Sequence, residues 1–168
     1  MELKQEYIVD RTGWASGPWD HEPDRVEWRD KDTGLPCLIL RNTWLRILCG
    51  YVAVPPSHSW YGVAYNACTL QSCKTWCSHT PESLGNVHGR LTFSSFCLEN
   101  SPTAPGEPGN VFWFGFDCGH AMDLLPGVVD RSGATHHFGE YRNVAYVQAE
   151  VTKLAAQLFI APDLTQHT

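Results

Sequence analysis

One stretch of this chain has the periodicity of an amphipathic helix, and it lies near the carboxyl end. Between Tyr141 and about Ile160, apolar residues recur at spacings of three and four, and Pro162 follows just beyond the end. The other patterned segments read as strands, and a helix of this kind buries its apolar stripe by packing on a sheet. We therefore predict an α+β fold: a mostly antiparallel sheet packed by one long C-terminal helix, with a long cysteine-rich loop excursion at about residues 55–87.

The first expected strands form a hairpin. Residues 25–30 alternate polar and apolar side chains, residues 31–34 have the composition of a turn, and residues 35–41 are again apolar. Residues 46–54 predict a third, buried strand. The two prolines that follow this strand, at positions 55 and 56, end it because proline has no amide donor for a sheet.

Two further strands are expected in the second half of the chain. Residues 88–93 have the pattern of a strand, and residues 110–117 have a stronger one. The second run is aromatic on both faces, which is typical of a strand in the middle of a sheet.

Length and charge limit the classes of function. The 168 residues suit a single globular domain, and the net charge of −6 with no basic cluster argues against binding to duplex nucleic acid. No run is long and apolar enough for a membrane helix, and the first residues do not resemble a signal peptide. We expect a cytoplasmic protein with no membrane partner and an oligomeric state that the sequence does not set.

The densest polar cluster follows the strongest expected strand. The sequence after that strand contains Asp117, His120 and Asp123, which we assign as candidate catalytic residues because the end of a central strand is rigid and open to solvent. If the turn is helical, His120 and Asp123 face the same way, and His88 can converge on them as a third metal ligand. The alternatives are that Asp117 caps a helix and His120 bonds Asp123 at the surface, or that Cys118 is a thiolate nucleophile.

A second cluster lies in the loop excursion and consists of Cys68, Cys73, Cys77 and His79. Four soft ligands within twelve residues predict a structural zinc site, although zinc knuckles use a shorter Cys-x2-Cys spacing. A local disulfide or free thiols are the alternatives, and the odd total of seven cysteines favours free thiols.

Aromatic and basic residues predict a pocket for a small molecule. Stacking walls and an anion contact would suit a nucleotide-like ligand, and the alternative is that the rings belong to the core. The residues assigned to this ligand are Tyr51, His58, His88, Arg90 and Trp113.

Four segments resemble an uncharacterised family of small proteins found in bacteriophages and bacteria. They begin Leu48-Cys49-Gly50-Tyr51, Val87-His88-Gly89-Arg90, Trp113-Phe114-Gly115-Phe116 and Tyr141-Arg142-Asn143-Val144, and the resemblance covers about residues 25–160. In that family a small residue is more usual where this chain has Arg90. The resemblance implies a phage or bacterial setting, with counter-defence as one role, and supplies no activity.

Three functions remain open. The first is a small-molecule binding protein, such as a phage counter-defence ligand sponge. The second is a hydrolase of a nucleotide-like substrate, in which His88, His120 and Asp123 hold zinc or another divalent metal and Asp117 is the base. The third is a structural or partner-binding protein. The chain has no phosphate-binding loop, dinucleotide fingerprint, nucleophile elbow or His-Glu-x-x-His motif, which disfavours the enzyme classes that use them.

Overall fold

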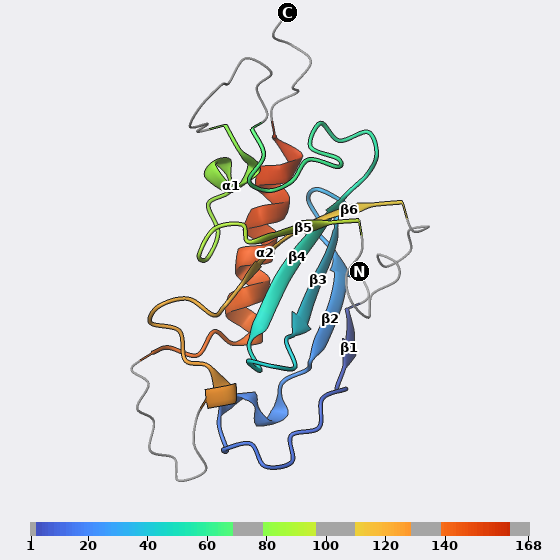
Figure 1. The fold of residues 1–168 in the computed structure, drawn as a ribbon. Helices are drawn as coiled ribbons and strands as arrows, with labels where there is room; N and C mark the ends of the chain where they lie inside the picture. Colours follow the sequence, from blue (N-terminus) through green and yellow to red (C-terminus); the bar gives the residue numbers. More distant parts are fainter. Residues whose placement is uncertain (1–2, 69–78, 97–109, 129–138, 162–168) are drawn as a thin grey trace, which may run out of the picture.

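The computed structural model describes residues 3–68, 79–96, 110–128 and 139–161 (Figure 1). These residues form the expected α+β fold, a six-stranded antiparallel sheet packed against one C-terminal helix. The strands, in their order across the sheet, are β1 (Lys4–Glu6), β2 (Arg25–Arg29), β3 (Pro36–Arg41), β4 (Leu48–Val54), β6 (Phe112–Asp117) and β5 (Phe93–Ser95).

The long helix is α2 (Val144–Phe159), which begins three residues after the expected start. The shorter helical elements are η1 (Pro18–His21), α1 (Pro81–Leu84) and η2 (Pro126–Val128). In the part of the chain that the structure describes, no helix is long and apolar enough to cross a membrane.

The predicted hairpin is confirmed. Strands β2 and β3 pair antiparallel, and Trp28 lies opposite Cys37. The turn between them is held by the Asp30 carboxylate, which accepts the amide N–H of Thr33 at 2.9 Å. Gly34 completes the turn with φ of 72°, a left-handed conformation that glycine adopts without a steric penalty.

Strand β6 lies inside the sheet, between β4 and β5, as its aromatic run predicts. The prediction of a strand at residues 88–93 is wrong, because β5 begins only at Phe93 and the preceding residues form a turn. Gly89 and Arg90 have φ of 60° and 73°, and two left-handed residues in succession do not fit an extended strand.

Helix α2 covers one face of the sheet and contacts β3 and β4 (Figure 1). Its buried side chains are spaced by three and four residues, as the sequence pattern predicts, and are Val147, Val151, Leu154, Ala155 and Leu158. The helix approaches closely at Gly50, where a Cβ atom would lie 2.5 Å from a Val151 methyl carbon.

A smaller core lies on the opposite face of the sheet. On β6, Phe112, Phe114 and Phe116 belong to the cluster under α2, whereas Trp113 belongs to a separate cluster with Leu38, Ala53 and Val111. Successive side chains of a strand point to opposite faces, so the aromatic run of β6 supplies both cores.

A buried ion pair connects the N-terminal segment to the sheet. Arg41 Nε lies 2.7 Å from Asp24 Oδ1, and neither side chain is exposed. Asp24 Oδ2 also accepts the amide N–H groups of Ile8 and Val9, and Arg11 donates to both carboxylate oxygens. Burial alone raises the pKa of Asp24, but these hydrogen bonds outweigh burial and hold that pKa below its usual value.

The start of α2 is attached to the same network. Asn143 caps the helix by accepting the N–H of Tyr146 at 2.9 Å, and Glu22 accepts the N–H of Val144 at 2.9 Å. The Tyr141 hydroxyl donates to Glu22 and accepts a hydrogen bond from Arg41. These contacts fix the beginning of the helix relative to the sheet.

Candidate functional site

The turn that follows β6 brings two of the assigned residues together. Asp123 Oδ2 accepts the backbone N–H of His120 at 3.0 Å, and the N–H of Asp123 bonds the carbonyl of His120. Asp117 accepts the N–H of Gly119 at 2.9 Å. The segment is a hydrogen-bonded turn, and it places His120 and Asp123 on the same side, as a helical turn would.

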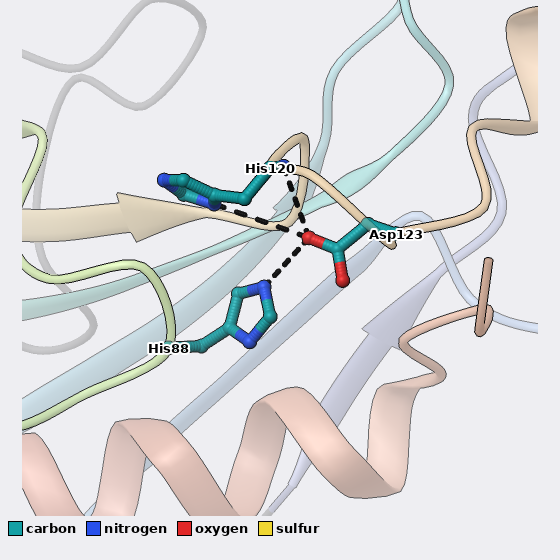
Figure 2. A group of neighbouring side chains, drawn as sticks. All are labelled: His88, His120 and Asp123. Atoms are coloured by element: carbon teal, nitrogen blue, oxygen red, sulfur yellow. Dashed lines mark hydrogen bonds and ion pairs between the residues drawn. The ribbon is translucent and has the colours of Figure 1, made fainter.

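His88 reaches the same place from a distant part of the chain. Its Nε2 lies 2.7 Å from Asp123 Oδ2 (Figure 2). One ligand atom from each of His88, His120 and Asp123 lies within 4.8 Å of the others. Two imidazoles and a carboxylate at this separation form a donor set for a divalent cation.

The ring of His120 provides the test of whether a cation fits. Its Nδ1 is buried and has no hydrogen-bond partner in the described part of the chain. The nearest acidic oxygens are Asp117 Oδ1 at 3.8 Å and Asp123 Oδ2 at 3.9 Å, which is too far for a hydrogen bond. A buried nitrogen costs free energy when it has no partner, and a cation between these atoms would provide one.

Asp123 is the centre of the cluster. Its side chain is 1% exposed, and Arg142 Nε donates to its Oδ1 at 2.8 Å. Burial by itself raises the pKa of Asp123, but hydrogen bonds from Arg142, His88 and the His120 amide hold it below the usual value. Asp123 is therefore an anion at neutral pH, with one oxygen facing the two histidines.

Three residues around the cluster have left-handed backbone conformations: Gly89, Arg90 and Met122. Gly89 is required sterically, because a Cβ atom there would lie 2.0 Å from Cε1 of the His120 ring. Arg90 and Met122 carry side chains at φ of 73° and 72°, a conformation that is uncommon outside glycine and tends to occur at functional sites.

Arg90 lies at the exposed rim of this cluster. Its side chain is exposed, and among the described residues its guanidinium forms no hydrogen bond or ion pair. Arg90 follows Gly89, which contacts the His120 ring, and it is two residues from His88 in the chain.

The structure does not bring the predicted aromatic walls to this site. Trp113 is 1% exposed and packs in the core on the far face of the sheet, and Tyr51 packs against that same core. His58 lies at the end of α2, where its Nε2 is 2.8 Å from the Leu158 carbonyl and its Nδ1 accepts the Trp60 amide. His58 therefore helps to cap the last turn of the helix.

The predicted zinc cluster is only partly within the described residues. Cys73 and Cys77 lie outside them, Cys68 is disulfide-bonded, and His79 is exposed. A disulfide-bonded sulfur is not a thiolate ligand, so the structure does not support Cys68 as a zinc ligand, and the part of the prediction that concerns Cys73 and Cys77 lies outside the described residues.

Cys118 is a buried thiol that directly follows β6 and belongs to the core cluster under α2. Burial raises its pKa far above the usual range for cysteine. The thiolate that a nucleophilic mechanism requires is therefore disfavoured, and Cys118 is a residue of the hydrophobic core.

Two residues near the cluster were not among the assigned ones. Tyr146 Oη lies 3.0 Å from His88 Nδ1, and Glu150 Oε2 accepts the backbone N–H of His88 at 2.7 Å. The signal in the sequence is their spacing: Tyr146 and Glu150 are four residues apart, so they form a polar stripe on one face of α2. The sequence does not show that His88 packs against this stripe, and without that contact the stripe is indistinguishable from an ordinary polar helix face.

A separate apolar cavity of about 190 Å³ lies at the other end of α2. Trp60 lines it, and its indole Nε1 is buried without a hydrogen-bond partner in the described ranges. The other main contacts are Gly85, Leu91, Leu154, Leu158 and Ile160.

Comparison of the chain with models of protein families, with curated proteins and with solved structures finds no match. The resemblance to the phage and bacterial family stays a prediction. The function is therefore argued from the chemistry of the site alone.

Proposed function

We propose that this protein is a hydrolase that uses one divalent cation, held by His88 Nε2, His120 Nδ1 and Asp123 Oδ2. The observation that carries the proposal is that one ligand atom from each of these residues lies within 4.8 Å of the others, and that His120 Nδ1 is buried with no partner among the described residues. His120 and Asp123 follow His88 by 32 and 35 residues in the sequence. The three side chains therefore meet only because the chain folds in this way.

The cation supplies Lewis-acid chemistry: when bound, it polarises an oxygen of the substrate and makes water a better nucleophile at neutral pH. Asp117 is the proposed base. Its side chain is 38% exposed, and its two oxygens are oriented by the Gly119 amide and by Thr92 Oγ1, each at 2.9 Å. An oriented and solvated carboxylate beside the ligands can take a proton from attacking water.

A phosphodiester of nucleotide-like chemistry is the proposed substrate. Arg90 is cationic, exposed and without a partner among the described residues, and it follows the glycine that contacts His120. A guanidinium in this position suits the anionic oxygens of a phosphodiester. In the reaction, the water oxygen bonds to phosphorus, Asp117 takes one proton, the bond to the leaving oxygen breaks, and that oxygen takes a proton from solvent.

The test is hydrolysis of bis(p-nitrophenyl) phosphate by protein freed of metal with a chelator. Activity should be absent after chelation and return when Mn²⁺ is added. Asp117→Asn should lower turnover by about 100-fold or more, the usual contribution of a general base. Exposed Asp32 is a matched control, and Asp32→Asn should leave turnover unchanged.

Hydrolysis that survives chelation would contradict a role for the cation. Unchanged turnover in Asp117→Asn would remove Asp117 from the mechanism. Mn²⁺ binding with no hydrolysis of the phosphodiester would contradict the hydrolase and leave a metal-binding protein.

Small-molecule binding without catalysis is the second candidate, and the apolar cavity beside Trp60 supports it. Enclosed apolar cavities of roughly 150 Å³ bind benzene-sized molecules, and this apolar pocket, which is partly open to solvent, has a similar volume of about 190 Å³. The ligand would be a compact apolar group. Native mass spectrometry of gently purified protein should detect a retained small molecule that is absent from Leu154→Trp, a variant that fills the cavity. A bare mass for the wild-type protein would speak against it.

A further inference from the structure

One face of α2 holds the proposed metal ligands in position. Tyr146 and Glu150 are four residues apart within the helix and so project from the same side, and Arg142, just before the helix, lies over the Tyr146 ring. Arg142 donates to Asp123, Tyr146 bonds the Nδ1 of His88, and Glu150 accepts the backbone N–H of His88. Every one of these contacts ends on a proposed metal ligand.

The contacts leave the His88 ring little freedom. The rings of Tyr146 and His88 meet edge to face with centroids 5.5 Å apart, and the Arg142 guanidinium lies 4.7 Å from the centre of the Tyr146 ring. Two residues before His88, Asn86 exchanges two hydrogen bonds with Gln157 of the same helix. Both the backbone and the ring of His88 are therefore attached to α2.

The Tyr146 hydroxyl suits a histidine that must present Nε2 to a cation. Nitrogen that binds a metal donates its lone pair, so the single proton of a neutral imidazole must then lie on Nδ1. The Tyr146 hydroxyl accepts a hydrogen bond from that N–H. When no cation is bound and Nε2–H donates to Asp123, the same hydroxyl rotates and donates to Nδ1. A hydroxyl satisfies both forms of the ring, and a phenyl ring satisfies neither.

We infer that Tyr146 and Glu150 are positioning residues for the proposed cation site: Tyr146 fixes the orientation and proton placement of the His88 ring, and Glu150 fixes its backbone. The inference rests on the proposed function, because it requires that His88 binds a cation. Partners of this kind, bonded to the second nitrogen of a histidine ligand, typically strengthen metal binding by 10–100-fold.

The experiment is a titration with Mn²⁺ followed by the electron paramagnetic resonance signal of the free ion. Mn²⁺ is a hard cation that prefers oxygen ligands to soft thiolates, so thiols of the chain do not compete for it. The Kd of Tyr146→Phe should be about tenfold higher than that of the wild-type protein. Tyr61 is the matched control, since its hydroxyl also makes one side-chain hydrogen bond, to Asn110 at 2.7 Å, away from the site.

Tyr146→Phe and Tyr61→Phe should have similar melting temperatures and differ in Kd, a difference that loss of a structural hydrogen bond alone does not produce. Glu150→Ala should also weaken Mn²⁺ binding, and Glu150→Gln should restore it because the amide oxygen still accepts the His88 N–H. If Tyr146→Phe does not fold, the comparison of Glu150→Ala with Glu150→Gln still tests whether α2 positions His88. Wild-type affinity in Tyr146→Phe and in Glu150→Ala would overturn the positioning roles and leave the proposed function standing. A wild-type protein that binds no Mn²⁺ would overturn the proposed function itself.

Discussion

Asp123→Asn should lower the affinity for a divalent cation by about 100-fold and abolish metal-dependent turnover. The change keeps the size of the side chain but removes the charge of a 1% exposed carboxylate that faces His88, His120 and Arg142. It also forces an amide NH2 against one of these donors, where the carboxylate offered only acceptors. Residues that only hold a ligand in place typically contribute 10–100-fold to metal affinity, and the loss of Asp123, itself a proposed ligand, should reach at least the upper end of that range.

Glu140→Gln is the control for this change. Glu140 is the second carboxylate on Arg142, at 2.7 Å, but its side chain is 74% exposed and lies outside the ligand set. Exposed ion pairs contribute little, so this variant should bind Mn²⁺ and turn over substrate as the wild-type protein does. Equal affinity in Asp123→Asn and the wild-type protein would remove Asp123 from the site.

The second large effect concerns stability. Asp24→Ala should lower the free energy of unfolding by about 3–5 kcal/mol, measured by urea denaturation at neutral pH, because it leaves the fully buried Arg41 guanidinium without its main carboxylate partner. The amides of Ile8 and Val9 lose their acceptor as well. Lys4→Ala is the control: it breaks an exposed ion pair with Glu6 and should leave the midpoint of the urea denaturation unchanged.

The difference in unfolding free energy between the wild-type protein and Asp24→Ala should become smaller as the pH is lowered. The pKa of Asp24 is lower in the folded protein than in the unfolded chain, so its charge stabilises the fold above the unfolded value of about 4. That contribution is lost as the pH falls through the lower, folded pKa. The gap between wild-type protein and Asp24→Ala should therefore narrow below about pH 4, and a gap that widens in acid would contradict the assignment.

The fold was predictable where a local pattern matched its final environment. The spacing of apolar residues in α2, the turn between β2 and β3, and the two aromatic faces of β6 each correspond to what those segments pack against. Residues 88–92 did not follow this rule. Their alternation suits a strand, but Gly89 packs on the ring of His120, a contact that depends on a segment 31 residues away.

The candidate site was predictable to a similar extent. His120 and Asp123 are close in the sequence, so a turn between them suffices to join them, and His88 was a reasonable third ligand. The aromatic residues could not be assigned to the site or to the core from the sequence, because the identity of a residue such as Tyr51 or Trp113 does not show on which face of the sheet it lies. Tyr146 and Glu150 acquire a role only once His88 lies against α2.

The most direct test of this account is the metal content of protein purified gently from cells, measured by native mass spectrometry and elemental analysis of one sample. We expect one divalent cation per chain, which is retained in Cys68→Ser and in the exposed-histidine control His21→Ala and is lost in His120→Ala. The same metal content in His120→Ala and the wild-type protein, or a wild-type protein that takes up no divalent cation when one is supplied, would contradict it.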